Sequence, residues 1–153
     1  MHLIPALLPN VATKTIKTTR IFTKPIDKVY KAWTDPRHLG NWWGPRGFTN
    51  SIEVFDLKPG GEWKFTMHGP DGKSYLNECE FVHIAPYDRI AWNHHSHPRF
   101  QVQVDLEEIT PEKTLVQYQM IFLDESTCSS MRSFVTEKNE ENLDKLEAEL
   151  AMI

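Results

Sequence analysis

Residues 100–122 read FQVQVDLEEITPEKTLVQYQMIF, and this stretch decides the fold. Apolar and polar residues alternate along both of its halves, and residues 110–113 (TPEK) are typical of a turn between them. Successive side chains of a strand point to opposite faces, so one face of this hairpin is apolar and the other is rich in glutamine. The stretch therefore predicts part of an antiparallel sheet that is covered on one side only.

The same alternation extends towards the N-terminus. Residues 63–67 and 76–84 also carry apolar side chains on one parity, and turn signals stand at residues 69–72 (GPDG) and 86–88 (PYD). Short turns between consecutive strands are typical of antiparallel neighbours. We therefore expect a meander of strands across residues 51–122.

Helical signals flank the meander on both sides. Residues 13–23 favour a first strand, and Pro25 and Asp35-Pro36 each begin a short helix after it. Beyond the meander, apolar residues recur at helical spacing, which predicts a helix over about residues 129–151. At 1.5 Å per residue this helix is roughly 34 Å long, enough to cross the whole sheet. The predicted fold class is α+β.

The length and composition are those of a globular domain. The chain has 153 residues, of which 40% are hydrophobic and 25% charged, and domains of this size bury a core without further support. We assign residues 13–153 to a single domain, preceded by a short N-terminal arm over residues 1–12. The net charge of −4 argues against nucleic acid as a partner, because a nucleic-acid binder needs a basic face.

Neither membrane insertion nor a bound metal or other cofactor is expected. No run approaches the ~20 apolar residues of a membrane span, and no basic residue of a signal peptide precedes Lys14. Cys79 and Cys128 form no zinc-binding pattern, which favours free thiols and a cytoplasmic location. Residues 94–97 (HHSH) favour a polar loop over a metal site, because adjacent imidazoles on an extended segment point to opposite sides.

Several short motifs resemble one known family. They are the TDP at residues 34–36, the WWGP at 42–45, the KPGGEW at 58–63, the GPDG at 69–72 and the IAP at 84–86. In their order and spacing, over about residues 15–123, the chain resembles the proteins similar to the activator of heat-shock-protein-90 ATPase, within the START-like (SRPBCC) superfamily. The resemblance implies a helix-grip fold, in which a curved antiparallel sheet wraps the long C-terminal helix around a cavity.

The function that this resemblance implies is the binding of a small hydrophobic or amphipathic ligand in the cavity. Two alternatives stay open, a cyclase- or hydrolase-like enzyme acting on a polyketide or aromatic substrate, and a regulator of a chaperone ATPase. A role without catalysis is favoured because no nucleophile motif such as GxSxG occurs. Residues 133–142 and Cys79 replace glycines that are frequent in relatives, so the identity of the ligand does not carry over. A homodimer is compatible with the sequence.

Strand parity predicts the wall of the cavity. Apolar members of the alternating strands should face the long helix, together with one residue of the Trp42-Trp43 pair at the rim and one aromatic residue of the helix itself. The intervening Gln101, Gln103, Gln117 and Gln119 should face away from the helix. The predicted apolar ligand-binding residues are Trp43, Phe65, Met67, Leu76, Trp92, Val102, Val104, Tyr118, Met120 and Phe134.

Glu78 and Glu80 are candidates for a charged group in this wall. If the turn at residues 69–72 closes a simple hairpin, Trp63 opposes Glu78, and both glutamates share the apolar face. A buried carboxylate has a raised pKa and could bind or protonate a ligand. A β-bulge near residue 77 would instead flip the parity and place both carboxylates outside. The sequence does not decide between these arrangements.

The long helix should carry a polar notch over the cavity. Its apolar stripe is interrupted at Lys138, Asn139 and Asn142, although the leucines that follow keep phase with Val135. An unpaired buried amide costs ~1–3 kcal/mol, so we expect Asn139 or Asn142 to contact water or ligand there. Asn142→Leu should then stabilise the empty protein and weaken ligand binding. The alternative is a helix that starts late or rotates and leaves these residues in solvent.

Overall fold

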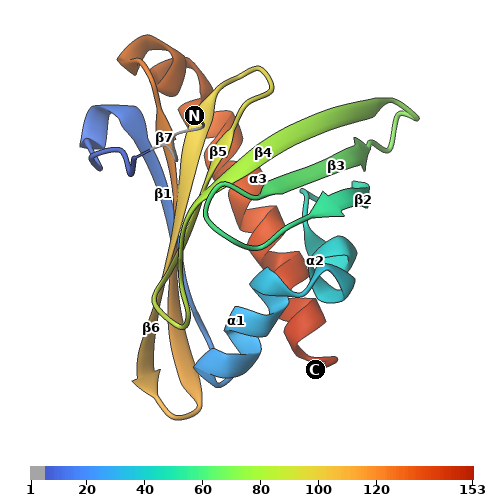
Figure 1. The fold of residues 1–153 in the computed structure, drawn as a ribbon, viewed down its shortest axis with the longest axis vertical. Helices are drawn as coiled ribbons and strands as arrows, with labels where there is room; N and C mark the ends of the chain where they lie inside the picture. Colours follow the sequence, from blue (N-terminus) through green and yellow to red (C-terminus); the bar gives the residue numbers. More distant parts are fainter. Residues whose placement is uncertain (1–5) are drawn as a thin grey trace.

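The computed structural model describes residues 6–153, which form a seven-stranded antiparallel sheet with helices packed against it (Figure 1). The strand order is β1-β7-β6-β5-β4-β3-β2, so the predicted meander is confirmed and β1 joins it beside β7. The elements are η1 (Ala12–Lys14), β1 (Thr15–Phe22), α1 (Ile26–Thr34), α2 (Pro36–Trp42), β2 (Thr49–Phe55), β3 (Glu62–His68), β4 (Ser74–Ala85), β5 (Arg89–His94), β6 (Phe100–Thr110), β7 (Lys113–Phe122) and α3 (Glu125–Leu150).

The sheet is strongly curved, and helix α3 lies along its inner face (Figure 1). Shifts of register interrupt the β2–β3, β4–β5 and β6–β7 pairings. Such bulges bend a strand and increase its twist. The sheet therefore wraps around α3, and the predicted helix-grip fold with two short helices after the first strand is confirmed.

Carboxylate caps set where two of the helices begin. Asp35 accepts a hydrogen bond from the N–H of Arg37, so α2 starts as predicted. Asp124 accepts a hydrogen bond from the N–H of Thr127 and caps α3. Helix α3 therefore begins at Glu125, and the predicted start near residue 129 is about one turn too late.

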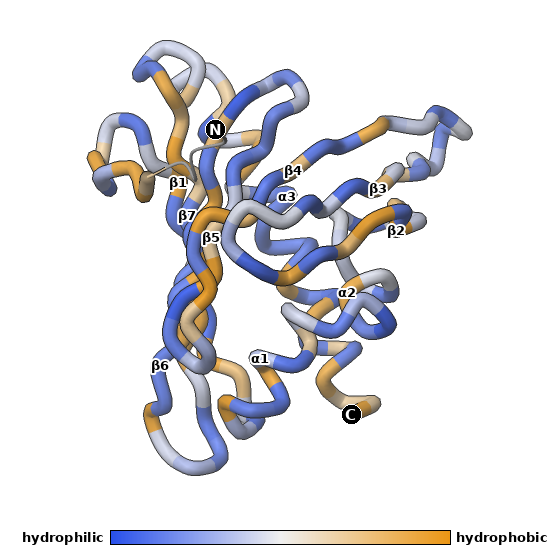
Figure 2. The backbone as a smooth tube through the Cα atoms, in the orientation of Figure 1, coloured by the Kyte–Doolittle hydropathy of each residue, from blue (hydrophilic) through white to orange (hydrophobic). Residues whose placement is uncertain are grey.

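Tryptophans dominate the core between the sheet and the helices. The ring of Trp33 packs edge-on against Trp42 with 4.7 Å between centroids, and Trp63 packs against Trp92 with 5.1 Å. All four side chains are buried. Figure 2 shows hydrophobic and hydrophilic stretches alternating along the strands that supply one side of this core. Edge-to-face packing of this kind adds to the burial of apolar area, so the cluster fixes α1 and α2 to the sheet.

The outer face of β6 and β7 is covered as well, so the prediction of a sheet covered on one side only is wrong there. Gln101, Gln103 and Gln119 face away from α3, as predicted, yet each is only 1–3% exposed because residues 6–11 cross over them. Gln101 accepts a hydrogen bond from the main-chain N–H of Leu8 at 2.9 Å, and Gln103 donates one to the carbonyl of Leu8 at 2.9 Å. Polar strand residues are therefore buried here by hydrogen-bonding to the main chain of a second segment.

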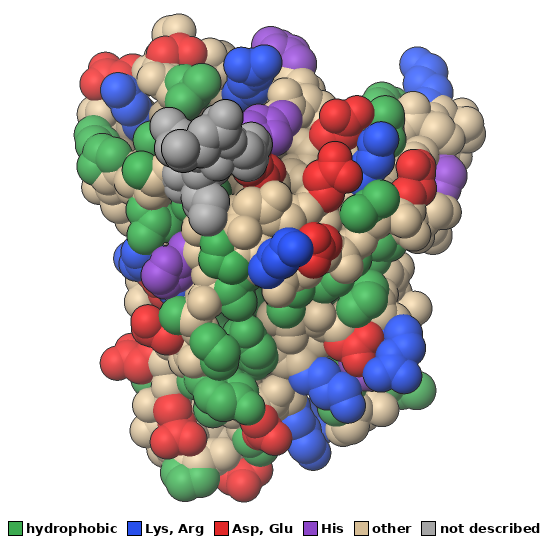
Figure 3. All heavy atoms as spheres, in the orientation of Figure 1, with side chains coloured by type: hydrophobic (Ala, Val, Ile, Leu, Met, Phe, Trp, Pro, Cys, Tyr) green, Lys and Arg blue, Asp and Glu red, His purple; other side chains and the backbone are tan. Residues whose placement is uncertain are grey.

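The surface carries charges of both signs. Figure 3 shows lysine and arginine side chains interspersed with aspartate and glutamate over the visible face. One such pair joins β1 to α3, where Arg20 lies 2.8 Å from both Glu140 and Asp144. Within residues 6–153, no helix is both long enough and apolar enough to cross a membrane.

Candidate ligand cavity

A cavity of about 160 Å³ lies between the inner face of the sheet and helix α3. Strands β3 to β7 supply one wall, α3 supplies the other, and the loop after α2 lies at its edge. The lining residues are Trp43, Gly44, Pro45, Phe65, Met67, Asn77, His94, Phe100, Tyr118, Met120, Val135, Lys138, Asn139 and Asn142. The space is mainly apolar, with a few amide and titratable side chains at fixed positions.

The structure brings together seven of the residues predicted from the sequence. Trp43, Phe65, Met67, Tyr118, Met120, Asn139 and Asn142 all line the cavity. Both tryptophans of the pair belong to the buried core, with Trp42 1% and Trp43 8% exposed, and Trp43 also lines the cavity. Their contact with a ligand stays a prediction.

Trp92, Val102 and Val104 face the predicted side but do not line the cavity, so that part of the prediction is wrong. Each is at most 3% exposed and belongs to the core cluster. The rings of Trp33 and Trp43 pack against Trp92 at 6.3 and 5.7 Å, and the short valine side chains lie buried in the same cluster. Larger aromatic rings thus occupy the space that these residues would otherwise border.

Leu76 and Glu78 lie outside the cavity, and their predicted place in its wall is wrong. In the β3–β4 pairing Leu76 is opposite Thr66 and Glu78 is opposite Lys64, so both point outward, and Leu76 is 50% exposed. A simple hairpin would have placed Glu78 opposite Trp63. The register differs by one residue, and such a shift moves every side chain to the other face.

The turn between β3 and β4 explains this shift. Gly69 donates its N–H to the carbonyl of Lys73 at 2.8 Å, which leaves three residues at the tip, and Gly72 has a φ of +83°. A three-residue loop ending in a left-handed glycine is a common hairpin, and it has the opposite parity from a two-residue loop. Of the two arrangements considered for Glu78 and Glu80, the one observed is that in which both carboxylates lie outside the cavity. The length of the loop produces it, and not a bulge near residue 77. Glu80 accordingly pairs with His95, whose Nε2 lies 3.1 Å from Oε1.

Phe134 also lies outside, and its predicted place in the site is wrong. Its side chain is 62% exposed, and the Lys138 ammonium stands 5.5 Å from the centre of its ring. The next residue, Val135, is buried and belongs to the stripe of α3 that starts at Cys128 and continues to Asn139 and Asn142. Because each residue turns a helix by about 100°, the position before Val135 points away from the sheet.

The predicted polar notch of α3 is present. Asn139 and Asn142 are 6% and 7% exposed and line the cavity, so the alternative that leaves them in solvent is wrong. Asn142 Oδ1 accepts a hydrogen bond from the N–H of Gly44 at 3.0 Å, and Asn139 Nδ2 lies 3.4 Å from Met120 Sδ. Asn142 thus has a structural partner that the sequence gave no means of finding.

The loop over the cavity is fastened to α3 by its main chain. Besides the bond from Gly44, the N–H of Arg46 donates to Glu141 Oε1 at 3.1 Å, and Lys145 Nζ donates to the carbonyl of Phe48 at 2.8 Å. Gly44 has a φ of +116°, and a Cβ there would lie 2.9 Å from Met67 Cε. Glycine therefore allows this loop to close tightly over the cavity.

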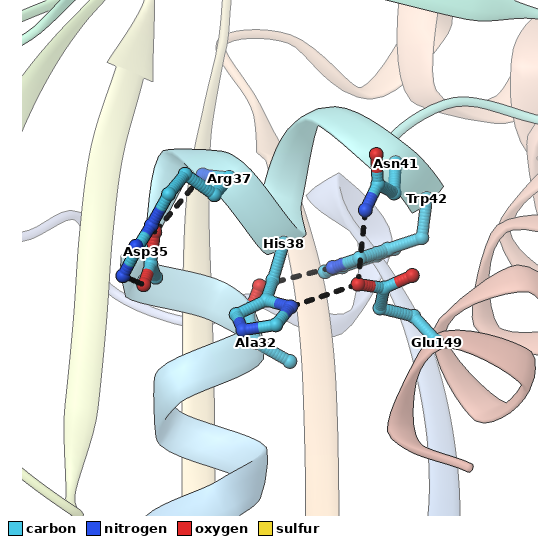
Figure 4. Close-up of polar contacts among 7 residues, drawn as sticks. All are labelled: Ala32, Asp35, Arg37, His38, Asn41, Trp42 and Glu149. Carbon is cyan, nitrogen blue, oxygen red and sulfur yellow. Dashed lines mark hydrogen bonds and ion pairs between the residues drawn. The ribbon is translucent and has the colours of Figure 1, made fainter. Parts of the chain in front are cut away.

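Helix α2, which precedes this loop, is anchored to the end of α3 (Figure 4). His38 Nδ1 lies 2.8 Å from Glu149 Oε2, and Asn41 Nδ2 donates to the same oxygen at 3.1 Å. Trp42 Nε1 donates to the carbonyl of Ala32 at 2.9 Å, which joins α2 to α1. These bonds fix the position of the residue that follows Trp42, which is Trp43 at the cavity.

His94 and Asn77 are site residues that the sequence reasoning missed. The ring of His94 stacks on Phe100 with 4.5 Å between centroids, while Nε2 lies 2.7 Å from Asn77 Oδ1 and Nδ1 lies 3.0 Å from the carbonyl of Pro98. Burial lowers the pKa of His94 below its usual value. His95 points to the other side, as the parity argument predicted for adjacent imidazoles.

Among residues 6–153, no cluster of three or more His, Cys, Asp or Glu side chains could hold a metal ion.

Burial keeps Tyr118 and Cys79 neutral on the inner face. It raises the pKa of Tyr118 and that of Cys79 well above their ordinary values. Cys79 and Cys128 are both buried and unpaired, which confirms the prediction of free thiols. A thiol with a raised pKa has little thiolate and is a poor nucleophile.

Together these features define a protein of the START-like helix-grip class with a small cavity beside its long helix. A scan of protein families matches residues 23–151 to the family described as "Activator of Hsp90 ATPase homolog 1-like protein". The chain belongs to this family, and the resemblance inferred from its motifs is confirmed.

Solved structures of similar proteins share the fold. A protein from Nitrosomonas europaea superposes with a TM-score of 0.85 at 20% identity, covering 93% of this chain and 97% of that chain. A protein from Arthrobacter aurescens gives 0.84 at 22% identity, with coverages of 99% and 94%. The AHSA1 protein from Silicibacter pomeroyi gives 0.74 at 22% identity, with coverages of 90% and 98%. A search of curated proteins found no match.

Proposed function

We propose that this protein binds a small apolar or amphipathic molecule in the cavity between its sheet and helix α3. The observation that carries the proposal is a 160 Å³ space with aromatic and methionine walls and two buried asparagines inside it. Ligand sites are typically concave and mostly apolar, with a few fixed polar groups. The buried free thiols support a reducing compartment such as the cytoplasm as the place of action.

Binding accounts for the chemistry of the cavity better than catalysis does. An acid–base reaction needs titratable groups free to exchange protons with a substrate. Both ring nitrogens of His94 face other protein groups, and burial keeps Tyr118 neutral. Lys138 lies 3.6 Å from the carboxylate of Glu141. The cyclase- or hydrolase-like alternative therefore gains no support from the described residues.

Native mass spectrometry of protein purified from its own host tests the proposal. We expect a small molecule retained by the wild type and by Phe134→Ala, a matched control because Phe134 is exposed on the same helix. Val135→Phe, which adds a ring at the cavity wall, should lose the molecule while keeping the fold, checked by circular dichroism. Equal retention by Val135→Phe would contradict the proposed site. A wild type that retains nothing, and whose melting temperature no small aromatic compound raises, would contradict binding altogether.

A further inference from the structure

The cavity has room for about one ring. An apolar cavity of ~150 Å³ admits benzene, whereas drug-sized ligands occupy ~300–1,000 Å³. The space here is about 160 Å³, and flat rings from Phe65, Phe100 and Tyr118 stand at its wall. Met67 and Met120 also line it, and the flexible thioether adapts to the outline of a small guest.

The polar groups inside the cavity offer both a donor and an acceptor. Asn142 uses Oδ1 to accept the N–H of Gly44, and its Nδ2 has no hydrogen-bond partner within residues 6–153. Asn139 uses Nδ2 only towards a weak acceptor, Met120 Sδ, and its Oδ1 has no partner among the same residues. Both side chains are more than nine-tenths buried. Neither free amide atom is among the fully buried unpaired atoms of residues 6–153, which are Thr18 Oγ1, Trp33 Nε1, Asn50 Oδ1 and Trp63 Nε1. Both can therefore be reached from the cavity and mark where a ligand would hydrogen-bond in place of water.

The charges around the cavity are already compensated. Lys138 lies at the rim, 3.6 Å from Glu141, and the carboxylate of Glu141 also accepts the N–H of Arg46. Two oxygens, Asn77 Oδ1 and the carbonyl of Pro98, face the ring nitrogens of His94 and compete for the one N–H of its neutral form, and burial disfavours its charged form. An anionic ligand would have to compete with Glu141 for Lys138, and a cationic one would find no carboxylate among the lining residues.

We infer that the cavity accepts a neutral, single-ring molecule that donates one hydrogen bond, to Asn139, and accepts another, from Asn142. This inference rests on the proposed function and specifies the ligand class of the same site. Phenols and cyclic amides have this combination of a ring with an adjacent donor and acceptor. Hydrocarbons lack the polar group, and aromatic carboxylates would have to compete with Glu141 for Lys138.

Titration calorimetry with three probes of similar size tests the inference: phenol, toluene and benzoate. Phenol should bind the wild type about tenfold more tightly than toluene, because hydrogen bonds to otherwise unpaired buried amides favour it. Benzoate should bind least tightly. In Asn139→Leu the preference of phenol over toluene should shrink, because only the hydrogen bond from Asn142 remains. Gln103→Leu, which alters a buried amide on the other face of the sheet, should keep the preference and is the matched control.

The outcomes separate the two proposals. Equal affinities of phenol and toluene for the wild type, or a phenol preference that is undiminished in Asn139→Leu, would overturn the inferred ligand class while leaving the binding function in place. Tighter binding of benzoate than of phenol would overturn the requirement for a neutral ligand. Failure of all three probes to bind, together with no retained molecule in the native mass spectrum, would count against the binding function itself.

Discussion

The two faces of the sheet at β6 and β7 bury amide groups in opposite ways. On the outer face Gln103 donates to Gln101 and to the carbonyl of Leu8, and Gln119 donates to Asp105 at 2.9 Å. On the inner side, Asn139 and Asn142 of α3 face a cavity and keep amide groups without partners among residues 6–153. The outer amides are hydrogen-bonded to one another and to neighbouring groups, whereas the inner amides each keep an atom that makes no hydrogen bond to the described residues.

This difference separates a structural amide from a candidate binding amide. A buried amide with all its partners contributes modestly to stability, and one without partners costs free energy in the empty protein. Proteins accept that cost at functional sites, where a ligand supplies the missing partner. A buried amide therefore indicates a structural role on the outer face of the sheet and a candidate binding role on the inner face.

The largest effect should come from placing an amide where the inner face has none. Val104 is fully buried and opposite Tyr118 in the β6–β7 pairing. Val104→Asn introduces a polar group without partners, so we expect the free energy of unfolding to fall by about 3 kcal/mol. Urea unfolding followed by tryptophan fluorescence measures this loss.

The converse change on the outer face is its control. Gln103→Leu removes the hydrogen bonds to Gln101 and Leu8 and should cost only about 1 kcal/mol. Equal losses for Val104→Asn and Gln103→Leu would mean that the two faces do not differ in their tolerance of amides.

The two asparagines of the cavity should respond in opposite directions. Asn139→Leu removes a poorly paired amide, so the empty protein should gain about 1 kcal/mol of stability. Asn142→Leu leaves the N–H of Gly44 without its acceptor and should cost about 1 kcal/mol. This reverses the sequence-based expectation that Asn142→Leu stabilises the empty protein. Thermal unfolding of both variants checks it, and a stabilised Asn142→Leu would show that the bond to Gly44 is unimportant.

Deletion of residues 1–10 should have a smaller effect on stability. Leu7 and its neighbours 6, 9 and 10 are exposed and bury little apolar area, and water can replace their hydrogen bonds to the glutamines. We expect a loss of about 1 kcal/mol or less in urea unfolding. Hydrogen exchange of the Gln101 and Gln103 side-chain amides should become faster, while that of Asn139 stays unchanged. Faster exchange at Asn139 as well would show that the two faces are not independent.

The smallest effect is on the pH dependence of stability. The neutral amides of both faces should not contribute to the loss of stability in acid. The hydrogen bonds and charge of Arg37 lower the pKa of Asp35 from its ordinary 3.8 to about 2. Its contribution to stability is therefore present above about pH 4 and is lost as the pH falls towards 2. Asp35→Asn keeps a good helix cap, so stability at pH 7 should change by only a few tenths of a kcal/mol.

The acid limb of unfolding distinguishes these contributions. Asp35→Asn should reduce the loss of stability between pH 4 and pH 2, measured by urea unfolding at each pH. Gln103→Leu and Asn139→Leu should keep the wild-type slope in that window. A changed dependence of stability on pH in either amide variant would show that the substituted amide interacts with a group that titrates between pH 4 and pH 2.

The sequence by itself determined the architecture and the chemistry of each face. Residues 100–122 alternate so regularly that the apolar set could pack only towards the helix and the glutamines only away from it. The leucine spacing of the long helix kept Asn139 and Asn142 in phase with its buried stripe, so their place at the cavity could also be predicted. These features depend on periods of two and 3.6 residues, which are local properties of the chain.

Only the tertiary structure decided which residues complete the site. A three-residue loop turned Leu76 and Glu78 outward and Asn77 inward, because hairpin register depends on the backbone of the turn. The partner of Asn142 is Gly44, which is far away in sequence, and the cover of the glutamines is the segment 6–11. Such pairings arise when distant parts of the chain meet, and no local periodicity encodes them. The sequence therefore specified which amides are buried, and the packing of distant segments decided which of them have partners.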